Sequence, residues 1–424
     1  MKFALALLSL AYVLPSVLGS SATIFIEFLS NPYPHLQVWE SGVNAGAKTI
    51  AEAQVATLVS LVSTSIHVRS LLDDINALVD LNQGYSQCQK GSNGASSTAP
   101  PPTTTTNSNN NGGSCSGATK FKYFGVNESS AEFGDGKFPG VLGTDYTWPS
   151  PSSIDYFVGK GMNFFRIPFA MERLSPSGLT GPFDATYLSG LKTIVSYTTS
   201  KGAYAAIDPH NYARFNGAVI TNTNAFSTWW KNLANEFKSN SRVIFDLNNE
   251  PWGISASEAA TLMQAGINGV RSSGASQLIF VEGTSWTGAW SWISSGNGDA
   301  FKSLNDPLGN TAIEMHQYLD SDGSGSSGTC VSSTVGVERF TAATNWLKAN
   351  NLKGFLGEIG GGSNDVCIAA VKNTLCYLQQ QGGTWIGAAW WAAGPWWGTY
   401  FQSIEPPSGA AVSRILPEAL LPFV

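Results

Sequence analysis

The chain has 424 residues, of which 12% are charged, and its formal net charge is −6 at pH 7. Aromatic residues make up another 12% and include 14 tryptophans. Nucleic-acid-binding proteins need basic patches against the phosphate backbone, so this charge balance argues against a nucleic acid as partner. Low charge combined with many tryptophans is typical of an extracellular protein that handles neutral polymers.

The first 114 residues predict three segments. Residues 1–19 resemble a signal peptide, because Lys2 precedes an apolar stretch that is too short to span a membrane. Residues 20–88 form an atypical segment with a single cysteine, and residues 89–114 a linker of Ser, Thr, Pro and Asn without an apolar face. We expect a secreted, soluble monomer; an uncleaved membrane anchor is the alternative.

Residues 115–424 predict one large domain of alternating β and α units. Eight β-like runs cover 120–126, 163–168, 204–208, 243–248, 277–282, 312–316, 354–358 and 385–391. Amphipathic helical stretches between them include 188–200, 225–240, 257–272, 337–350 and 368–381. Eight such units predict an α/β fold, the (β/α)8 TIM barrel. A doubly wound open sheet is the alternative, but 125–128 does not form the glycine-rich phosphate loop expected after its first strand.

Two glutamates stand at the ends of short apolar runs. Glu250 follows the fourth run, and Glu358 ends the seventh. A buried carboxylate destabilises a fold unless it is paired, so these positions suggest a site that requires acids. Hydrolysis of a glycosidic bond uses two carboxyl groups, one to protonate the leaving oxygen and one to attack the sugar or activate water. A barrel gathers such groups at the carboxyl ends of its strands.

Both histidines of this domain, His210 and His316, also fall at predicted strand ends. Together with Asp208 and a glutamate they could bind a metal. However, the sequence has no His-x-His or His-Glu-x-x-His spacing that would bring two ligands together. We therefore predict no metal and no cofactor, and expect the histidines to bind sugar hydroxyls or to position a carboxylate.

Other strand-end side chains suit a sugar site. Arg166 and Tyr318 could keep one glutamate ionised, since an opposite charge lowers a carboxyl pKa, and Asn249 offers an amide to a sugar hydroxyl. A plain buried ion pair is the alternative for Arg166. Six tryptophans fall in predicted loops or strand ends, where they either stack on pyranose rings or pack inside the protein: Trp148, Trp286, Trp290, Trp292, Trp391 and Trp396.

An ordered set of short motifs occupies successive strand ends: Arg166-Ile167-Pro168, His210-Asn211, Asn249-Glu250-Pro251, His316-Gln317-Tyr318, Gly357-Glu358 and Ala389-Trp390-Trp391. This set resembles glycoside hydrolase family 5, most closely its fungal endo-β-1,4-glucanases (cellulases), over essentially all of 115–424.

The resemblance implies retaining hydrolysis of internal bonds in cellulose, a β-glucan, with Glu250 as acid/base and Glu358 as nucleophile. It also implies that Arg166, His210, Asn249, His316 and Tyr318 surround the substrate and that Trp391 stacks on it; we add Trp286 as a second stacking residue. A mannanase, a xyloglucan-active hydrolase and a catalytically inactive wall protein are the alternatives, because a fold does not fix the substrate.

Five cysteines in an exported chain favour disulfides. We predict a bond between Cys330 and Cys367, which would join the loops after the sixth and seventh strands, and leave the partner of Cys376 open. In the segment 20–88, residues 37–39 and 81–89 resemble the first and last strands of a fungal cellulose-binding module. The cysteines expected between them are missing, so we predict a disrupted module. The sequon at Asn127 lies at a strand end, and we expect it to stay unglycosylated.

Overall fold

The computed structural model describes residue 115 and residues 118–424. The predicted signal peptide, atypical segment and linker lie outside these residues, and so does the resemblance to a cellulose-binding module.

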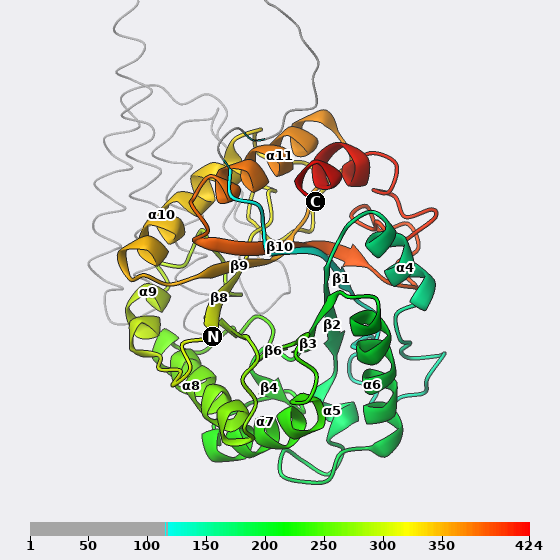
Figure 1. Ribbon diagram of the computed structural model, residues 1–424, viewed down its shortest axis with the longest axis vertical. Coiled ribbons are helices and arrows are strands. Elements are labelled where there is room, and N and C mark those ends of the chain that lie inside the picture. The colour runs from blue at the N-terminus through cyan, green and yellow to red at the C-terminus, as the bar shows by residue number, and fades with distance from the viewer. Residues whose placement is uncertain (1–114, 116–117) are drawn as a thin grey trace, which may run out of the picture. The chain divides into compact units, whose positions relative to one another are not determined.

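Eight parallel strands close into a barrel (Figure 1). They are β1 (Tyr123–Glu128), β2 (Phe164–Phe169), β3 (Tyr204–Pro209), β6 (Val243–Asp246), β7 (Ile279–Glu282), β8 (Thr311–His316), β9 (Gly354–Ile359) and β10 (Trp385–Ala393). Closure occurs where β1 pairs with β10 on one side and with β2 on the other. The predicted barrel is confirmed, and the open sheet is wrong. A short hairpin of β4 (Arg214–Phe215) and β5 (Ala218–Val219), absent from the predicted elements, lies in the loop after β3.

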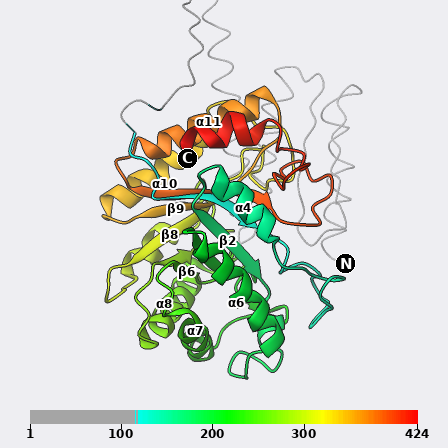
Figure 2. The ribbon, with the colours of Figure 1, turned by 45° about the vertical axis from the view of Figure 1, so that its right-hand side comes forward.

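Helices surround the strands (Figures 1 and 2). The longer ones are α4 (Pro151–Gly159), α6 (Ala185–Ser200), α7 (Thr223–Phe237), α8 (Ala256–Ser272), α10 (Val335–Ala349) and α11 (Asp365–Gln379). Short turns complete the set: α5 (Met171–Leu174), α9 (Asn297–Ala300), η1 (Phe301–Ser303), η2 (Leu416–Leu420) and η3 (Leu421–Phe423). The five predicted helices are all present, with ends that differ by a few residues.

Side-chain caps fix where several helices begin. Asp184 accepts a hydrogen bond from a backbone N–H in the first turn of α6, and Asn222 does the same for α7. Ser255 and Glu258 form a reciprocal capping box at the start of α8. Such caps satisfy N–H groups that have no partner inside the helix, so the polar residue before each apolar stretch sets the boundary.

The barrel interior is layered. An apolar layer contains Phe164, Ile244, Phe280 and Phe355, with the rings of Phe280 and Phe355 stacked at 4.4 Å between centroids. Because alternate residues of a strand face the same side, the residues two positions further along also point inward. In β2, β6, β7 and β8 these are the charged residues Arg166, Asp246, Glu282 and Glu314, all fully buried. The charged layer therefore lies directly on the apolar one.

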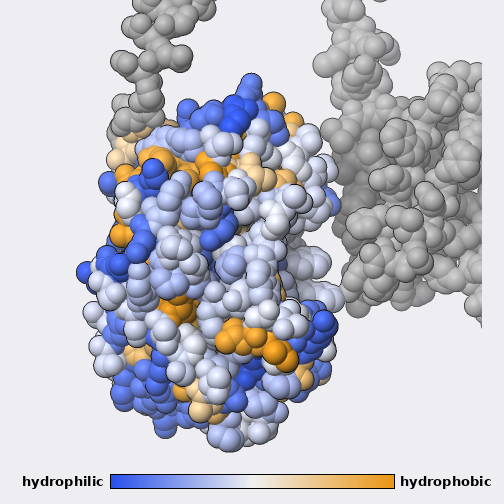
Figure 3. Space-filling view, turned by 90° about the vertical axis from the view of Figure 1, so that its right-hand side faces the viewer, coloured by the Kyte–Doolittle hydropathy of each residue, from blue (hydrophilic) through white to orange (hydrophobic). Residues whose placement is uncertain are grey.

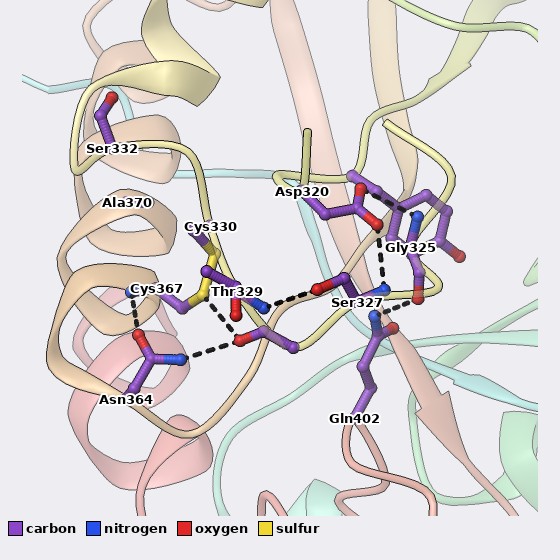
Figure 4. Close-up of a disulfide and its surroundings, with 12 residues drawn as sticks. Asp320, Gly325, Ser327, Thr329, Cys330, Ser332, Asn364, Cys367, Ala370 and Gln402 are labelled. Carbon is purple, nitrogen blue, oxygen red and sulfur yellow. Dashed lines mark hydrogen bonds between the residues drawn. A yellow bond between two sulfur atoms is a disulfide. The ribbon is translucent and has the colours of Figure 1, made fainter. Parts of the chain in front are cut away.

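Two disulfides tie the outer segments together. Cys330, in the loop after β8, is bonded to Cys367 in the first turn of α11 (Figure 4). Next to this bond, Asn364 caps α11 and donates a hydrogen bond to the Gly328 carbonyl oxygen at 2.8 Å. The second disulfide answers the open question of Cys376, which is bonded to Cys115 across 261 positions of sequence. It fastens the start of the domain to α11.

Hydrophilic residues dominate the face shown in Figure 3, where hydrophobic residues form separate patches. Among the described residues, no helix combines the length and the apolar character needed to cross a bilayer. The side chain of Asn127 is fully buried and donates hydrogen bonds to the carbonyl oxygens of Gly357 and Trp390, so its amide faces protein and not solvent.

Candidate active site

Glu250 and Glu358 come together at the carboxyl end of the barrel. Glu358 lies near the end of β9, and Glu250 lies in the loop that follows β6. One carboxylate oxygen of each glutamate and one ring nitrogen of His316 all lie within 4.8 Å of one another. Barrel closure thus pairs two acids that are far apart in the sequence.

Glu358 has two strong hydrogen-bond donors. The Arg166 Nη1 donates to its Oε1 at 3.0 Å, and the Tyr318 hydroxyl donates to its Oε2 at 2.6 Å. Burial raises the pKa of Glu358, while the charge of Arg166 and the Tyr318 hydroxyl act against that rise. These two contacts favour the ionised form of Glu358.

Glu250 has a different environment. Its Oε1 lies 2.7 Å from the Nδ1 of His316. Burial raises the pKa of Glu250 well above its usual value, and the nearby negative charge of Glu358 raises it further. Burial also lowers the pKa of His316 well below its ordinary range, so this imidazole is neutral and brings no charge that would ionise Glu250. The two glutamates are therefore tuned differently, with the proton held on Glu250.

Arg166 is the centre of a larger buried network and does not form a simple pair. Its guanidinium nitrogens lie 2.7 to 3.1 Å from five carboxylates: Asp208, Asp246, Glu282, Glu314 and Glu358. One positive charge cannot neutralise five acids. Burial accordingly raises the pKa of Asp208 and of Asp246 to about 7, and that of Glu282 and of Glu314 well above the usual value.

Three members of this network were not among the site residues predicted from the sequence: Asp246, Glu282 and Glu314. Each stands two positions after an inward-facing apolar residue, in a strand that was predicted from its apolar residues. The period of two in these strands was the signal that could have placed them inside the barrel.

A chain of hydrogen bonds orients Asn249 and His210. The Asn249 Oδ1 accepts from Arg166 Nη2 at 2.8 Å, so its amide nitrogen faces the His210 Nε2 at 3.2 Å. That nitrogen of His210 must then accept, and its Nδ1 carries the proton that it donates to Asp208 at 2.7 Å. Burial lowers the pKa of His210, in agreement with a neutral ring. The amide of Asn249 is thereby locked in one orientation.

The predicted tryptophans divide between the surface and the core. Trp391 lies nearly parallel to His210, with ring centroids 5.4 Å apart, and is 9% exposed. Trp286 is 52% exposed and stacks on Trp252, over which the guanidinium of Arg214 lies. Trp290 and Trp396 are about half exposed, Trp148 packs against Tyr146 and Tyr187, and Trp292 is fully buried against Phe301 and Trp346. Trp292 is therefore a core residue.

Two groups of described residues have the spacing of metal ligands: Glu250, His316 and Glu358, and Glu282, Glu314 and His316. The guanidinium of Arg166 lies within about 3.1 Å of Glu282, Glu314 and Glu358. A fixed positive charge at this distance repels a divalent cation, so the same carboxylates suit an arginine better than a metal.

Comparisons with known proteins extend over the whole barrel. Residues 119–394 match the family model Cellulase (glycosyl hydrolase family 5). The chain is 55% identical over 299 residues to endo-beta-1,4-glucanase B of Aspergillus niger, which covers 70% of this chain and 89% of that protein. It is 54% identical over 334 residues to endoglucanase gh5-1 of Neurospora crassa, covering 78% and 85% of the two chains. The solved structure of XacCel5A in complex with cellopentaose superposes with a TM-score of 0.69 at 42% identity and covers 72% of this chain and 99% of that one.

Proposed function

This chain belongs to the cellulase family, glycosyl hydrolase family 5, and from that premise we propose that it is a secreted endo-β-1,4-glucanase that hydrolyses internal bonds of cellulose with retention. The observation that carries the proposal is the close pair of Glu250 and Glu358 with its unequal surroundings.

The spacing of the two carboxylates supports retention. Retaining glycosidases hold their carboxyl groups about 5–5.5 Å apart, whereas inverting enzymes leave about 6.5–9.5 Å for a water molecule. An oxygen of Glu250 lies within 4.8 Å of an oxygen of Glu358, which favours direct attack by one carboxylate.

The surroundings of the two glutamates support a different role for each. Glu358, supported by Arg166 and Tyr318, is the carboxylate that attacks the anomeric carbon. Glu250, whose pKa is raised well above its usual value by burial and by Glu358, holds the proton that passes to the leaving oxygen. After the leaving group departs, the ionised Glu250 takes a proton from water, which attacks the glycosyl ester on Glu358. Two displacements restore the original configuration.

Neighbouring side chains hold the sugar. The fixed amide of Asn249, the residue before Glu250, suits the 2-hydroxyl, while Trp391 and Trp286 offer flat apolar faces to pyranose rings. The names of the relatives, endo-beta-1,4-glucanase and endoglucanase, and the cellopentaose in the XacCel5A structure favour a β-1,4-glucan. Two disulfides among the described residues fit an oxidising compartment, in agreement with the predicted signal peptide.

Cleavage of cellopentaose followed by proton NMR tests the mechanism. We expect the β-anomer to appear first and to mutarotate later; an initial α-anomer would contradict retention. Reducing-end release from carboxymethylcellulose, mannan and xyloglucan tests the substrate. Faster release from mannan or xyloglucan would favour those alternatives, and absence of turnover on all three would favour an inactive wall protein.

A further inference from the structure

Glu282, at the end of β7, contacts the main chain of Glu250 and the arginine that is bound to Glu358. Its Oε2 accepts a hydrogen bond from the backbone N–H of Glu250 at 2.7 Å. Its Oε1 accepts one from Arg166 Nη2 at 3.1 Å, and the Nη1 of the same guanidinium donates to Glu358. One buried side chain therefore joins the main chain of Glu250 to the cation beside Glu358.

The backbone of Glu250 needs such support. Its φ is +44°, in the left-handed region that residues with a Cβ atom rarely adopt. Backbone of this kind persists only where surrounding contacts hold it. The bond from the Glu250 N–H to a fully buried carboxylate oxygen is a contact of this type, and it acts on the residue whose side chain must reach the leaving oxygen.

A glutamate suits this position because its side chain has two hydrogen-bond acceptor oxygens. Two N–H donors, one from Glu250 and one from Arg166, point at the two oxygens of Glu282. Each oxygen of a carboxyl group keeps an acceptor lone pair for one of these donors, in the ionised and in the protonated form. A glutamine of the same shape must turn its NH2 group toward one of these donors, and an aspartate is one methylene shorter and cannot reach both. Neither replacement keeps the pair of contacts.

We propose that Glu282 is a positioning residue that sets the placement of the Glu250 carboxyl relative to Glu358, and so controls proton transfer to the leaving group without touching the substrate. This inference rests on the proposed function, in which Glu250 is the acid/base.

The test compares two substrates in the Glu282→Gln variant. Cellopentaose has a poor leaving group that needs the proton of Glu250, whereas 2,4-dinitrophenyl β-cellobioside has one that leaves without it. We expect kcat/KM to fall about 100-fold for cellopentaose, the effect of a misplacement of about 1 Å. For the dinitrophenyl substrate we expect only the smaller loss that acts through Arg166 and that both substrates share.

Asp246→Asn is the matched control. Asp246 accepts from Arg166 Nε at 2.7 Å and belongs to the same buried layer, whereas the backbone N–H of Glu250 donates to Glu282. The loss of the Asp246 charge should affect both substrates by a similar factor, because it changes the charge around Arg166 and Glu282 and leaves the bond from Glu282 to the Glu250 N–H in place. Melting temperatures identify any variant that fails to fold. Should Glu282→Gln be unfolded, Glu282→Asp takes its place with the same expected selectivity.

Three results would overturn the inference: equal losses on the two substrates in the Glu282 variant, normal cellopentaose activity in a folded variant, or the same selective loss in Asp246→Asn. A native enzyme without activity on either substrate would instead refute the proposed function, so the two failures are distinguishable.

Discussion

Replacing Tyr318 with phenylalanine removes one hydrogen bond from the proposed nucleophile and leaves the aromatic ring in place. The Tyr318 hydroxyl donates to Glu358 Oε2 at 2.6 Å, and the carboxylate is almost completely buried. A hydrogen bond to a charged group contributes about 1.5–3 kcal/mol. Since one pKa unit corresponds to about 1.36 kcal/mol, the pKa of Glu358 should rise by about 1–2 units.

The direction of the shift in the pH profile follows from the role of Glu358, which attacks only when ionised. A higher pKa delays ionisation, so the acid limb of the kcat/KM profile should move to higher pH by about 1–2 units. The assay is the hydrolysis of cellopentaose as a function of pH. The basic limb, which reports the proton on Glu250, should stay within a few tenths of a unit.

Two outcomes would refute this reasoning. An acid limb that does not move would mean that the Tyr318 hydroxyl does not stabilise the anion of Glu358. A shift of both limbs by the same amount would point to a general change in the site. The Phe variant should keep the melting temperature of the native protein within a few degrees, because its ring still packs beside Trp391.

Further predictions concern the nucleophile, the interior acids and an exposed tryptophan. Glu358→Gln should abolish turnover and leave the melting temperature nearly unchanged; near-normal activity would disprove the assignment. Asp208 and Asp246 have pKa values raised to about 7, so the folded state binds more protons than the unfolded state above about pH 4. Unfolding measured by calorimetry should therefore become easier as the pH rises from about 4 to 7, and a flat profile would contradict this linkage. Trp286→Ala should raise KM for cellopentaose about 5- to 30-fold with little effect on kcat, in line with about 1–2 kcal/mol for the apolar ring face lost from the contact; an unchanged KM would remove Trp286 from the substrate site.

The sequence by itself determined the number and order of the barrel strands and the residues at their ends. Apolar runs separated by amphipathic stretches can only be covered on both faces in a parallel α/β arrangement, and eight of them suit a closed barrel. Each short motif is local, so Glu250, Glu358 and Arg166 could be assigned to one end of the barrel without any contact being known.

The tertiary structure alone decided which of these residues touch. Arg166 on β2 reaches Glu282 on β7 and Glu358 on β9 because closure brings opposite strands across one interior. No local sequence pattern gives the distance between these side chains, since that distance depends on the strand register around the whole barrel. The same holds for the bond between Cys115 and Cys376, where the start of the domain meets α11. Sequence periodicity fixes the side of a strand on which a residue lies, and only closure fixes what it faces.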